Sequence, residues 1–274
     1  MQLVDIGLNL THKRFDKDRE AVLDRARRAK VTQMVLTGTN ELSSKLAANY
    51  AARYALDPAR RNVMFSTAGV HPHDAGEVSP DFIEHLKALA ERPEVVAIGE
   101  CGLDYHRNFT PRDVQQQVFQ QQLALAESLR MPLFLHSREA HEDLMKHLSA
   151  LPDLPPVIVH CFTGTHEELT DYLNAGFYIG ITGWICDERR GTELQKLVKH
   201  IPLDRIMIET DAPYLTPRDI PEDAEVQPKS GRNEPALLPH ILRAVAGHMG
   251  VEPQTLAEAT TRNAQAFFSL PSRR

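Results

Sequence analysis

The chain has 274 residues and a formal net charge of −6, and 42% of its residues are hydrophobic and 25% charged. This composition is typical of a globular protein and excludes collagen-like, coiled-coil and disordered chains. No apolar run approaches the roughly 20 residues that span a bilayer. The N-terminus has no signal-like apolar core, and three cysteines are too few for a disulfide framework. We therefore expect a cytoplasmic protein without membrane contacts, in which any nucleic-acid contact uses a local basic surface.

Short β-branched runs alternate with longer amphipathic segments along nearly the whole chain. Several runs, such as 157–159 and 206–208, are continuously apolar, which is typical of parallel strands covered on both faces. The predicted strands are Leu3–Gly7, Gln33–Gly38, Val63–Gly69, Val95–Gly99, Pro132–His136, Pro156–His160, Phe177–Thr182 and Arg205–Glu209.

Helical patterns separate these strands. In 113–130, Val118, Leu123 and Leu129 fall on one stripe, and glutamines fill the other side. Asn233-Glu234-Pro235 predicts the start of the last helix, because it combines a capping residue with an early proline. The predicted helices are about 15–30, 41–56, 80–91, 113–130, 139–149, 166–175, 189–199 and 236–248.

Eight strands that are each followed by a helix predict an α/β fold of the (β/α)8 TIM-barrel type. A doubly wound open sheet shows the same alternation, but no Gly-rich phosphate fingerprint follows the first strand, and the length fits the barrel. We expect a single domain over residues 1–274, since no linker or composition shift divides the chain. The long irregular segment 212–232 follows the eighth strand, and loops of that length in compact domains are usually functional.

Residues of the kinds that bind metals fall where the apolar strands stop. In a (β/α)8 barrel these strand ends and the loops after them build the active site. Because many histidines and carboxylates share one rim, the pattern predicts a metal site. In chain order, the ends carry Asp5, Thr37, His71, Glu100, His136, His160, Thr182 with Trp184, and Asp211.

The mixture of carboxylate oxygens and imidazole nitrogens suits Mg²⁺, Mn²⁺ or Zn²⁺ and differs from the thiolate-rich sites of structural zinc. Cys101 and Cys161 each stand one position past a candidate ligand, so we expect them to point away and pack in the interior. Asp211 is either a ligand or the base that orients a water molecule. The candidate ligands are Glu100, His136, His160 and Asp211.

Six phrases around these residues form a recognisable set: Gly69-Val70-His71-Pro72-His73, Ile98-Gly99-Glu100-Cys101-Gly102-Leu103-Asp104, Leu133–Arg138, His160-Cys161-Phe162-Thr163-Gly164, Glu209-Thr210-Asp211-Ala212-Pro213-Tyr214 and Arg232-Asn233-Glu234-Pro235. Together they resemble the TatD family of metal-dependent deoxyribonucleases. The resemblance runs in order from about Asp5 to Phe268. Segments 5–11 and 183–191 resemble the subgroup that gives the family its name.

The resemblance implies a TIM-barrel metallohydrolase that acts as a Mg²⁺-dependent 3′→5′ exonuclease on single-stranded DNA and RNA, with Mn²⁺ or Zn²⁺ able to occupy the same site. It also implies a role in DNA repair after oxidative damage. By resemblance, Glu100, His136 and His160 match metal ligands, and Asp211 matches the carboxylate that binds metal or activates water. Glu100 and Asp211 are thus the expected catalytic residues, and His71 is expected at the substrate phosphate.

One departure from the family pattern concerns the first strand. Most members carry a His-X-His pair there, whereas this chain has Gly7 and Asn9, although Asp5 is present. We therefore favour one firmly held metal ion, with a second recruited by Glu100, Asp211 and the substrate phosphate. Mg²⁺ commonly binds in this way, with few protein ligands and several water molecules.

Substrate contacts are expected from cations and aromatic residues near the strand ends. Arg138 is the best phosphate-binding candidate, because its guanidinium matches phosphate geometry. Trp184, the only tryptophan, could stack on a base, and Tyr105 and Phe162 are weaker candidates. The expected partners are single-stranded DNA and RNA, and we expect a monomer. The cations near the rim are Arg107, Arg138, Arg189, Arg190, Arg218, Lys229 and Arg232.

Two other functions share this fold and these residues, because a barrel and a metal site do not fix the substrate. One is a metal-dependent ester hydrolase such as a D-aminoacyl-tRNA deacylase. The other is a catalytically silent barrel that binds metal or nucleic acid, which Gly7 and Asn9 suggest. The presence of all four candidate ligands argues against the silent barrel.

Overall fold

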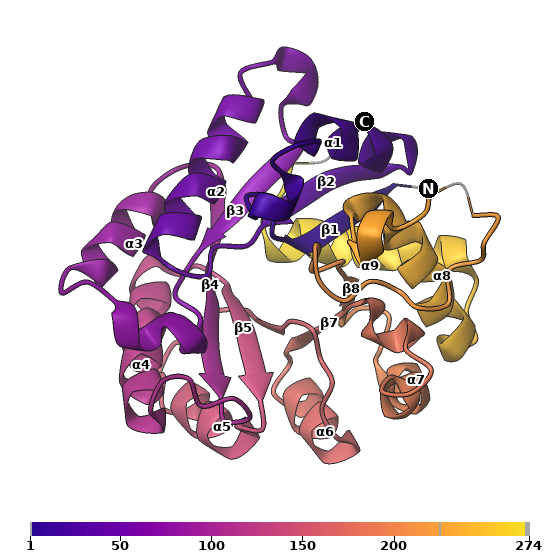
Figure 1. Ribbon diagram of the computed structural model, residues 1–274. Helices are drawn as coiled ribbons and strands as arrows, with labels where there is room; N and C mark the ends of the chain where they lie inside the picture. The colour runs from indigo at the N-terminus through magenta and orange to yellow at the C-terminus, as the bar shows by residue number, and fades with distance from the viewer. Residues whose placement is uncertain (1, 225, 272–274) are drawn as a thin grey trace. The chain divides into compact units, whose positions relative to one another are not determined.

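The computed structural model describes residues 2–224 and 226–271 (Figure 1). Its strands follow one another in chain order in one parallel sheet and alternate with helices, which confirms the predicted (β/α)8 barrel. A doubly wound sheet would instead reverse its strand order. The strands are β1 (Leu3–Leu8), β2 (Val31–Leu36), β3 (Met64–Ala68), β4 (Val95–Asp104), β5 (Leu133–Arg138), β6 (Val157–Val159), β7 (Tyr178–Ile181) and β8 (Ile206–Ile208).

The chain divides into two compact units. The central unit comprises residues 36–160, and the terminal unit comprises residues 1–35 together with 161–274. The expectation of a single domain stays a prediction. Within residues 2–224 and 226–271, no helix combines the length and the apolar character needed to cross a membrane.

The central unit carries four α-helices, and β4 and β5 run side by side in it as parallel neighbours (Figure 1). The first of the helices begins at a capping box, in which Asn40 and Ser43 bond each other's backbone N–H groups. All four predicted helices of this region are found, within two residues at either end. They are α2 (Glu41–Tyr54), α3 (Phe82–Ala90), α4 (Arg112–Leu129) and α5 (His141–Ser149), and the 3-10 helices are η2 (Pro58–Arg60) and η3 (Pro72–Glu77).

Strand β4 extends five residues beyond its predicted end, so that Glu100 lies within the strand. Two glycines make this possible. Gly99 and Gly102 have φ values of 141° and 143°, a region that favours glycine. A Cβ atom on Gly102 would collide with the carbonyl oxygen of His136, and one on Gly99 would collide with that of Phe134. The glycines of this segment therefore let β4 pass close to β5, and this closeness brings Glu100 and His136 together.

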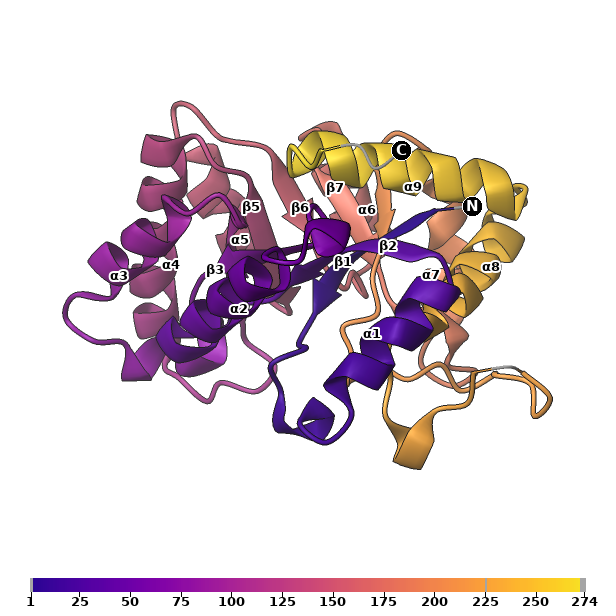
Figure 2. The same cartoon turned by 90° about the horizontal axis from the view of Figure 1, so that it is seen from above.

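The terminal unit has a helix that the sequence pattern did not predict. α9 (Pro253–Phe267) follows the eighth strand–helix repeat and packs on β1 and β8. Its buried stripe, which includes Leu256, Thr260 and Phe267, has helical spacing, and Pro253 stands in its first turn. α8 and α9 lie against each other (Figure 2). The other helices are α1 (Arg19–Arg28), α6 (His166–Asn174), α7 (Thr192–Leu197) and α8 (Leu238–Met249), with 3-10 helices η1 (Lys13–Phe15), η4 (Gly183–Cys186), η5 (Val198–His200), η6 (Lys229–Gly231) and η7 (Pro235–Leu237).

Two predicted helix starts in this unit were too early for physical reasons. The carboxylate of Asp187 accepts hydrogen bonds from the backbone N–H groups of Arg189 and Arg190, and this turn delays the start of α7 to Thr192. Near residue 15, the ring of His12 accepts the backbone N–H of Arg14 and caps the short 3-10 helix η1. The α-helix predicted from residue 15 therefore begins only at Arg19. Local side-chain bonds of this kind compete with helical hydrogen bonds.

The close approach at Gly102 generates a test of the fold. Gly102→Ala is expected to lower the free energy of unfolding by at least about 2 kcal/mol, because a methyl group would collide with the backbone of β5. Gly247→Ala is the matched control, since a Cβ atom there meets no atom within 4 Å, and it is expected to stabilise α8 slightly. Denaturant unfolding measures both variants. A Gly102→Ala protein as stable as the wild type would contradict this role.

Candidate metal centre

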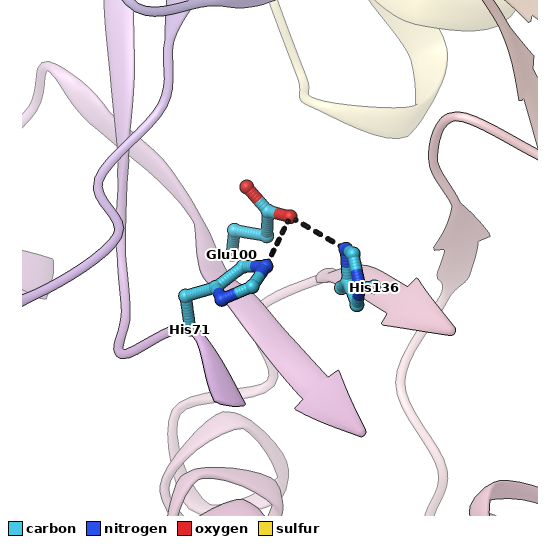
Figure 3. Close-up of side chains that lie close together, drawn as sticks. All are labelled: His71, Glu100 and His136. Atoms are coloured by element: carbon cyan, nitrogen blue, oxygen red, sulfur yellow. Dashed lines mark hydrogen bonds and ion pairs between the residues drawn. The ribbon is translucent and has the colours of Figure 1, made fainter. Parts of the chain in front are cut away.

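Three histidines surround one carboxylate oxygen in the central unit. The Oε1 atom of Glu100 lies 2.7 Å from Nε2 of His160, 3.0 Å from Nδ1 of His136 and 3.4 Å from Nε2 of His71. Figure 3 shows the imidazoles of His71 and His136 pointing toward this oxygen. Glu100 and His160 are buried, and the other two histidines are partly buried. The structure thus brings together three of the four candidate ligands, Glu100, His136 and His160, and the predicted substrate contact His71.

Local backbone structure aims each of these side chains. His71 follows β3 and caps η3, and its Nδ1 atom accepts the backbone N–H of His73 at 3.1 Å, which turns Nε2 toward Glu100. His136 lies within β5, opposite Gly102 in the strand register. His160 follows β6, and its ring stacks on Phe134 with the centroids 4.6 Å apart. The side chains are therefore held by the backbone and by packing before any ligand binds.

A second carboxylate, which sequence analysis did not select, extends the cluster. The Oδ2 atom of Asp104 lies 3.1 Å from Nε2 of His136 and 2.8 Å from Nε2 of His73. Asp104 stands four positions after Glu100 in the same strand, and residues separated by an even number share a face of a strand. That spacing was the signal that could have identified it. His136 is consequently held at both ring nitrogens by carboxylates.

The charges of the cluster support one another. Burial alone would raise the pKa of Glu100, but the charge of His160 and hydrogen bonds from the imidazoles of His136 and His160 hold it well below its usual range. Burial opposes charge on His136, yet its hydrogen bonds to Asp104 and Glu100 raise its pKa. Burial lowers the pKa of His71 to about 3, so this imidazole is neutral at pH 7. The cluster therefore combines ionised carboxylates with a neutral imidazole.

The donor atoms fit a divalent cation. One ligand atom each from His71, Glu100 and His136 lies within 4.8 Å of the other two. Carboxylate oxygen and neutral imidazole nitrogen together are ligands for Zn²⁺, Mn²⁺ and related ions. The ring of His136 already has the carboxylate of Asp104 at its other nitrogen, an arrangement that commonly orients metal-binding histidines.

Asp211 and the residues of the first strand lie in the terminal unit. The Nδ2 group of Asn9 donates to Oδ1 of Asp211 at 2.9 Å, and the backbone N–H of Asp211 donates to the carbonyl of Gly7 at 2.8 Å. Asp5 is fully buried, and it accepts hydrogen bonds from the backbone and hydroxyl groups of Thr210. Burial raises the pKa of Asp5 to about 7. The side chain of Asn9 thus fixes the carboxylate of Asp211, whereas residue 7 contributes only its backbone carbonyl.

Most of the predicted rim arginines are paired within the terminal unit. Arg232 is buried and forms a two-pronged ion pair with Asp18 at 2.7 and 2.8 Å, so its role is structural. Arg190, Arg189 and Arg218 pair with the acidic residues at 187 and 188. Arg138 ends β5 and is partly buried. The side chain of Lys229 lies outside the described part of the structure.

The three aromatic residues predicted to contact the substrate, Trp184, Tyr105 and Phe162, are stacked or buried within the protein. Arg190 stacks on the ring of Trp184 at 4.5 Å, and the indole N–H donates to the Arg190 carbonyl at 3.0 Å. Tyr105 and Phe162 are buried. The structure adds Phe109, whose ring is 65% exposed and meets that of His73 edge-on, with the centroids 4.8 Å apart. Phe109 is thus an exposed aromatic residue beside the cluster. Only its position in the loop after β4, the strand that contains Glu100, could have indicated a role from the sequence.

The three cysteines are free thiols. Cys101 is buried, as expected for a packing residue, and burial raises its pKa. Cys161 is only partly buried, contrary to expectation, because its backbone is in the left-handed region at φ 48° and its N–H donates to Oε1 of Glu209 at 2.7 Å.

Together, the fold and the His/carboxylate cluster define a metal-dependent hydrolase on a (β/α)8 barrel. A family model described as TatD related DNase matches residues 4–269. The chain belongs to this family, and it is accordingly a hydrolase of phosphodiester bonds.

Curated relatives match nearly the whole chain. A protein of Erwinia billingiae named 3′-5′ ssDNA/RNA exonuclease TatD is 51% identical over 98% of this chain and 100% of its own length. Proteins of the same name from Pantoea ananatis and Salmonella typhimurium are 50% and 49% identical, each over 98% of this chain and at least 99% of their own.

Solved structures show the same fold. A TatD family hydrolase from Entamoeba histolytica superimposes with a TM-score of 0.89 at 27% identity, covering 99% of both chains. A TatD homologue from Escherichia coli gives a TM-score of 0.83 at 27% identity and covers 98% of both chains.

Proposed function

We propose that this protein is a metal-dependent 3′→5′ exonuclease that hydrolyses single-stranded DNA and RNA. The observation that carries the proposal is the convergence of three imidazoles on one carboxylate oxygen of Glu100. This cluster occurs in a chain that is about half identical, over its full length, to proteins named as exonucleases of this polarity.

Glu100 and His136 are the proposed holders of the metal ion, completed by His160. Mg²⁺ is the proposed ion, with Mn²⁺ or Zn²⁺ able to take its place. A divalent ion here would acidify a bound water molecule and neutralise charge on a phosphoryl oxygen. Asp104 then acts through His136, because its carboxylate fixes the orientation of that ring.

The remaining roles belong to the chain's own groups. Asp211 is proposed to bind metal or to accept the proton of the attacking water, and its hydrogen bond from Asn9 fixes one of its oxygens. His71 is neutral at pH 7. When its Nε2 group turns away from Glu100, it is proposed to donate a hydrogen bond to the substrate phosphate. Arg138 is proposed to pair with a phosphate of the strand. We also propose that the protein acts as a monomer in the cytoplasm, in the repair of oxidised DNA.

Label release from an oligonucleotide tests the proposal. With Mg²⁺ added to chelator-treated protein, a 3′ label on single-stranded DNA is expected to be lost at once, and a 5′-labelled strand is expected to shorten stepwise. Glu100→Gln removes the central ligand without changing its size, and it is expected to reduce the rate at least about a hundredfold, as loss of a key electrostatic group does.

Leu56→Ala provides the control, since Leu56 is an exposed residue with no place in the cluster, and its rate is expected to equal that of the wild type. Full activity of the Glu100→Gln protein would overturn the proposed centre. Internal cuts, or early loss of the 5′ label, would overturn the polarity. Release of amino acids from D-aminoacyl-tRNA without any nuclease activity would replace the exonuclease with a deacylase.

Base stacking generates a second prediction. Phe109→Ala is expected to raise KM for a single-stranded oligonucleotide about fivefold or more while changing kcat little, because a stacked base contributes about 1–3 kcal/mol. Trp184→Ala is expected to weaken binding of single strands more than binding of duplex. Steady-state release of mononucleotides gives KM and kcat, and titration with each substrate gives affinity.

Leu56→Ala again serves as the control, because it removes an exposed apolar side chain of the same unit. An unchanged KM in Phe109→Ala would show that Phe109 does not contact the substrate. Equal losses of single-strand and duplex affinity in Trp184→Ala would exclude stacking as the role of Trp184.

A further inference from the structure

A second group of metal-binding side chains lies in the terminal unit. It consists of Cys186 at the end of η4, Asp219 in the loop after β8, and His240 in the first turn of α8. One ligand atom of each residue lies within 4.8 Å of the other two. Nε2 of His240 is 2.6 Å from Oδ1 of Asp219.

We propose that Cys186, Asp219 and His240 bind a metal ion of the zinc type, which fixes the loop after β8 to η4 and α8. A thiolate, an imidazole and a carboxylate are the three kinds of side chain that bind Zn²⁺ in proteins. The sulfur ligand disfavours Mg²⁺ and Ca²⁺, which prefer oxygen ligands. Three protein ligands leave a fourth position for water.

The spacing requires only a small adjustment. Tetrahedral ligands at about 2.0–2.3 Å from Zn²⁺ lie roughly 3.3–3.8 Å from one another. The hydrogen bond between His240 and Asp219, now 2.6 Å long, would therefore open by roughly 0.7 Å. Asp219 can make this movement, because its side chain is 52% exposed. The exposed carboxylate also provides access from solvent to the buried sulfur of Cys186.

A nucleophilic role for Cys186 does not fit the same geometry. Reactive cysteines have a neighbouring cation or a helix N-terminus that lowers the pKa of the thiol. Here burial raises the pKa of Cys186, and the negative charge and hydrogen bond of Asp219 raise it further. A bound cation would reverse this effect and release the thiol proton.

The position of the group explains what such an ion would do. The loop already lies close over η4, because a Cβ atom on Gly183 would collide with the carbonyl of Leu215. Arg218, next to Asp219, forms a two-pronged ion pair with Glu188 at 3.2 Å. These exposed ionic contacts are weak. A metal ion at Cys186 would hold the loop far more firmly, together with η4, which carries Trp184.

Cobalt absorption tests the proposal independently of nuclease activity. Metal-free, full-length protein is titrated with Co²⁺, and a thiolate-to-cobalt charge-transfer band is expected to appear, to be complete by two equivalents and to vanish when Zn²⁺ is added. The band is expected to be absent in Cys186→Ala and to persist in Glu100→Gln, since the centre around Glu100 contains no sulfur ligand. Asp219→Asn is expected to weaken Co²⁺ binding by at least about tenfold.

Cys161→Ala is the matched control, because it removes the partly exposed cysteine and is expected to keep the band. A wild-type protein without the band would overturn the proposal, as would a band that survives in Cys186→Ala. Thermal unfolding gives a second readout. Zn²⁺ is expected to raise the Tm of Glu100→Gln but not that of the double variant Glu100→Gln/Asp219→Asn, because both variants lack the centre around Glu100 and differ only in the exposed residue Asp219. Equal shifts in these two variants would contradict the site.

Discussion

The buried carboxylate of Glu100 is the constraint on which the central unit depends. An ionised carboxylate in the interior is costly unless charges and hydrogen bonds compensate it. His160, His136 and His71 supply this compensation, and strands β3 to β6 bring their side chains to Glu100. The close passage of β4 and β5 at Gly102 follows from the same requirement. These contacts also fix the imidazoles and the carboxylate in the arrangement that is proposed to hold a divalent cation.

In the terminal unit, polar side chains of residues 232–235 form ion pairs and hydrogen bonds that hold the backbone near Asp211. Its motif at residues 232–235 contains no metal ligand. Instead, Arg232 pairs with Asp18, Glu234 pairs with Arg25 at 2.6 Å, and the Asn233 amide donates to the carbonyls of Thr210 and Tyr214. These bonds fix the backbone on both sides of Asp211. The polar residues of this segment therefore hold the backbone around Asp211, the carboxylate that is proposed to bind metal or to activate water.

Much of the fold could be predicted from the sequence, because continuously apolar strands and striped helices have distinct periods. Helix α9 was missed because it follows the eighth repeat. The extension of β4 was missed because glycines usually end strands, whereas Gly99 and Gly102 are required there by contact with β5. Strand ends also identified Glu100, His136, His160 and His71. They did not identify Asp104, although its even spacing from Glu100 places both carboxylates on one face of β4. They also did not identify Phe109, whose contact with His73 depends on a side-chain direction that spacing does not give.

The central claim is that Glu100 and its imidazoles hold a divalent cation. The most direct measurement is anomalous X-ray diffraction from crystals of the wild-type protein soaked in Mn²⁺. We predict an anomalous peak within bonding distance of the Glu100 carboxylate and of His136, with His160 as a further ligand. The account would be contradicted by Mn²⁺ bound elsewhere while the three imidazoles keep their contacts with Glu100.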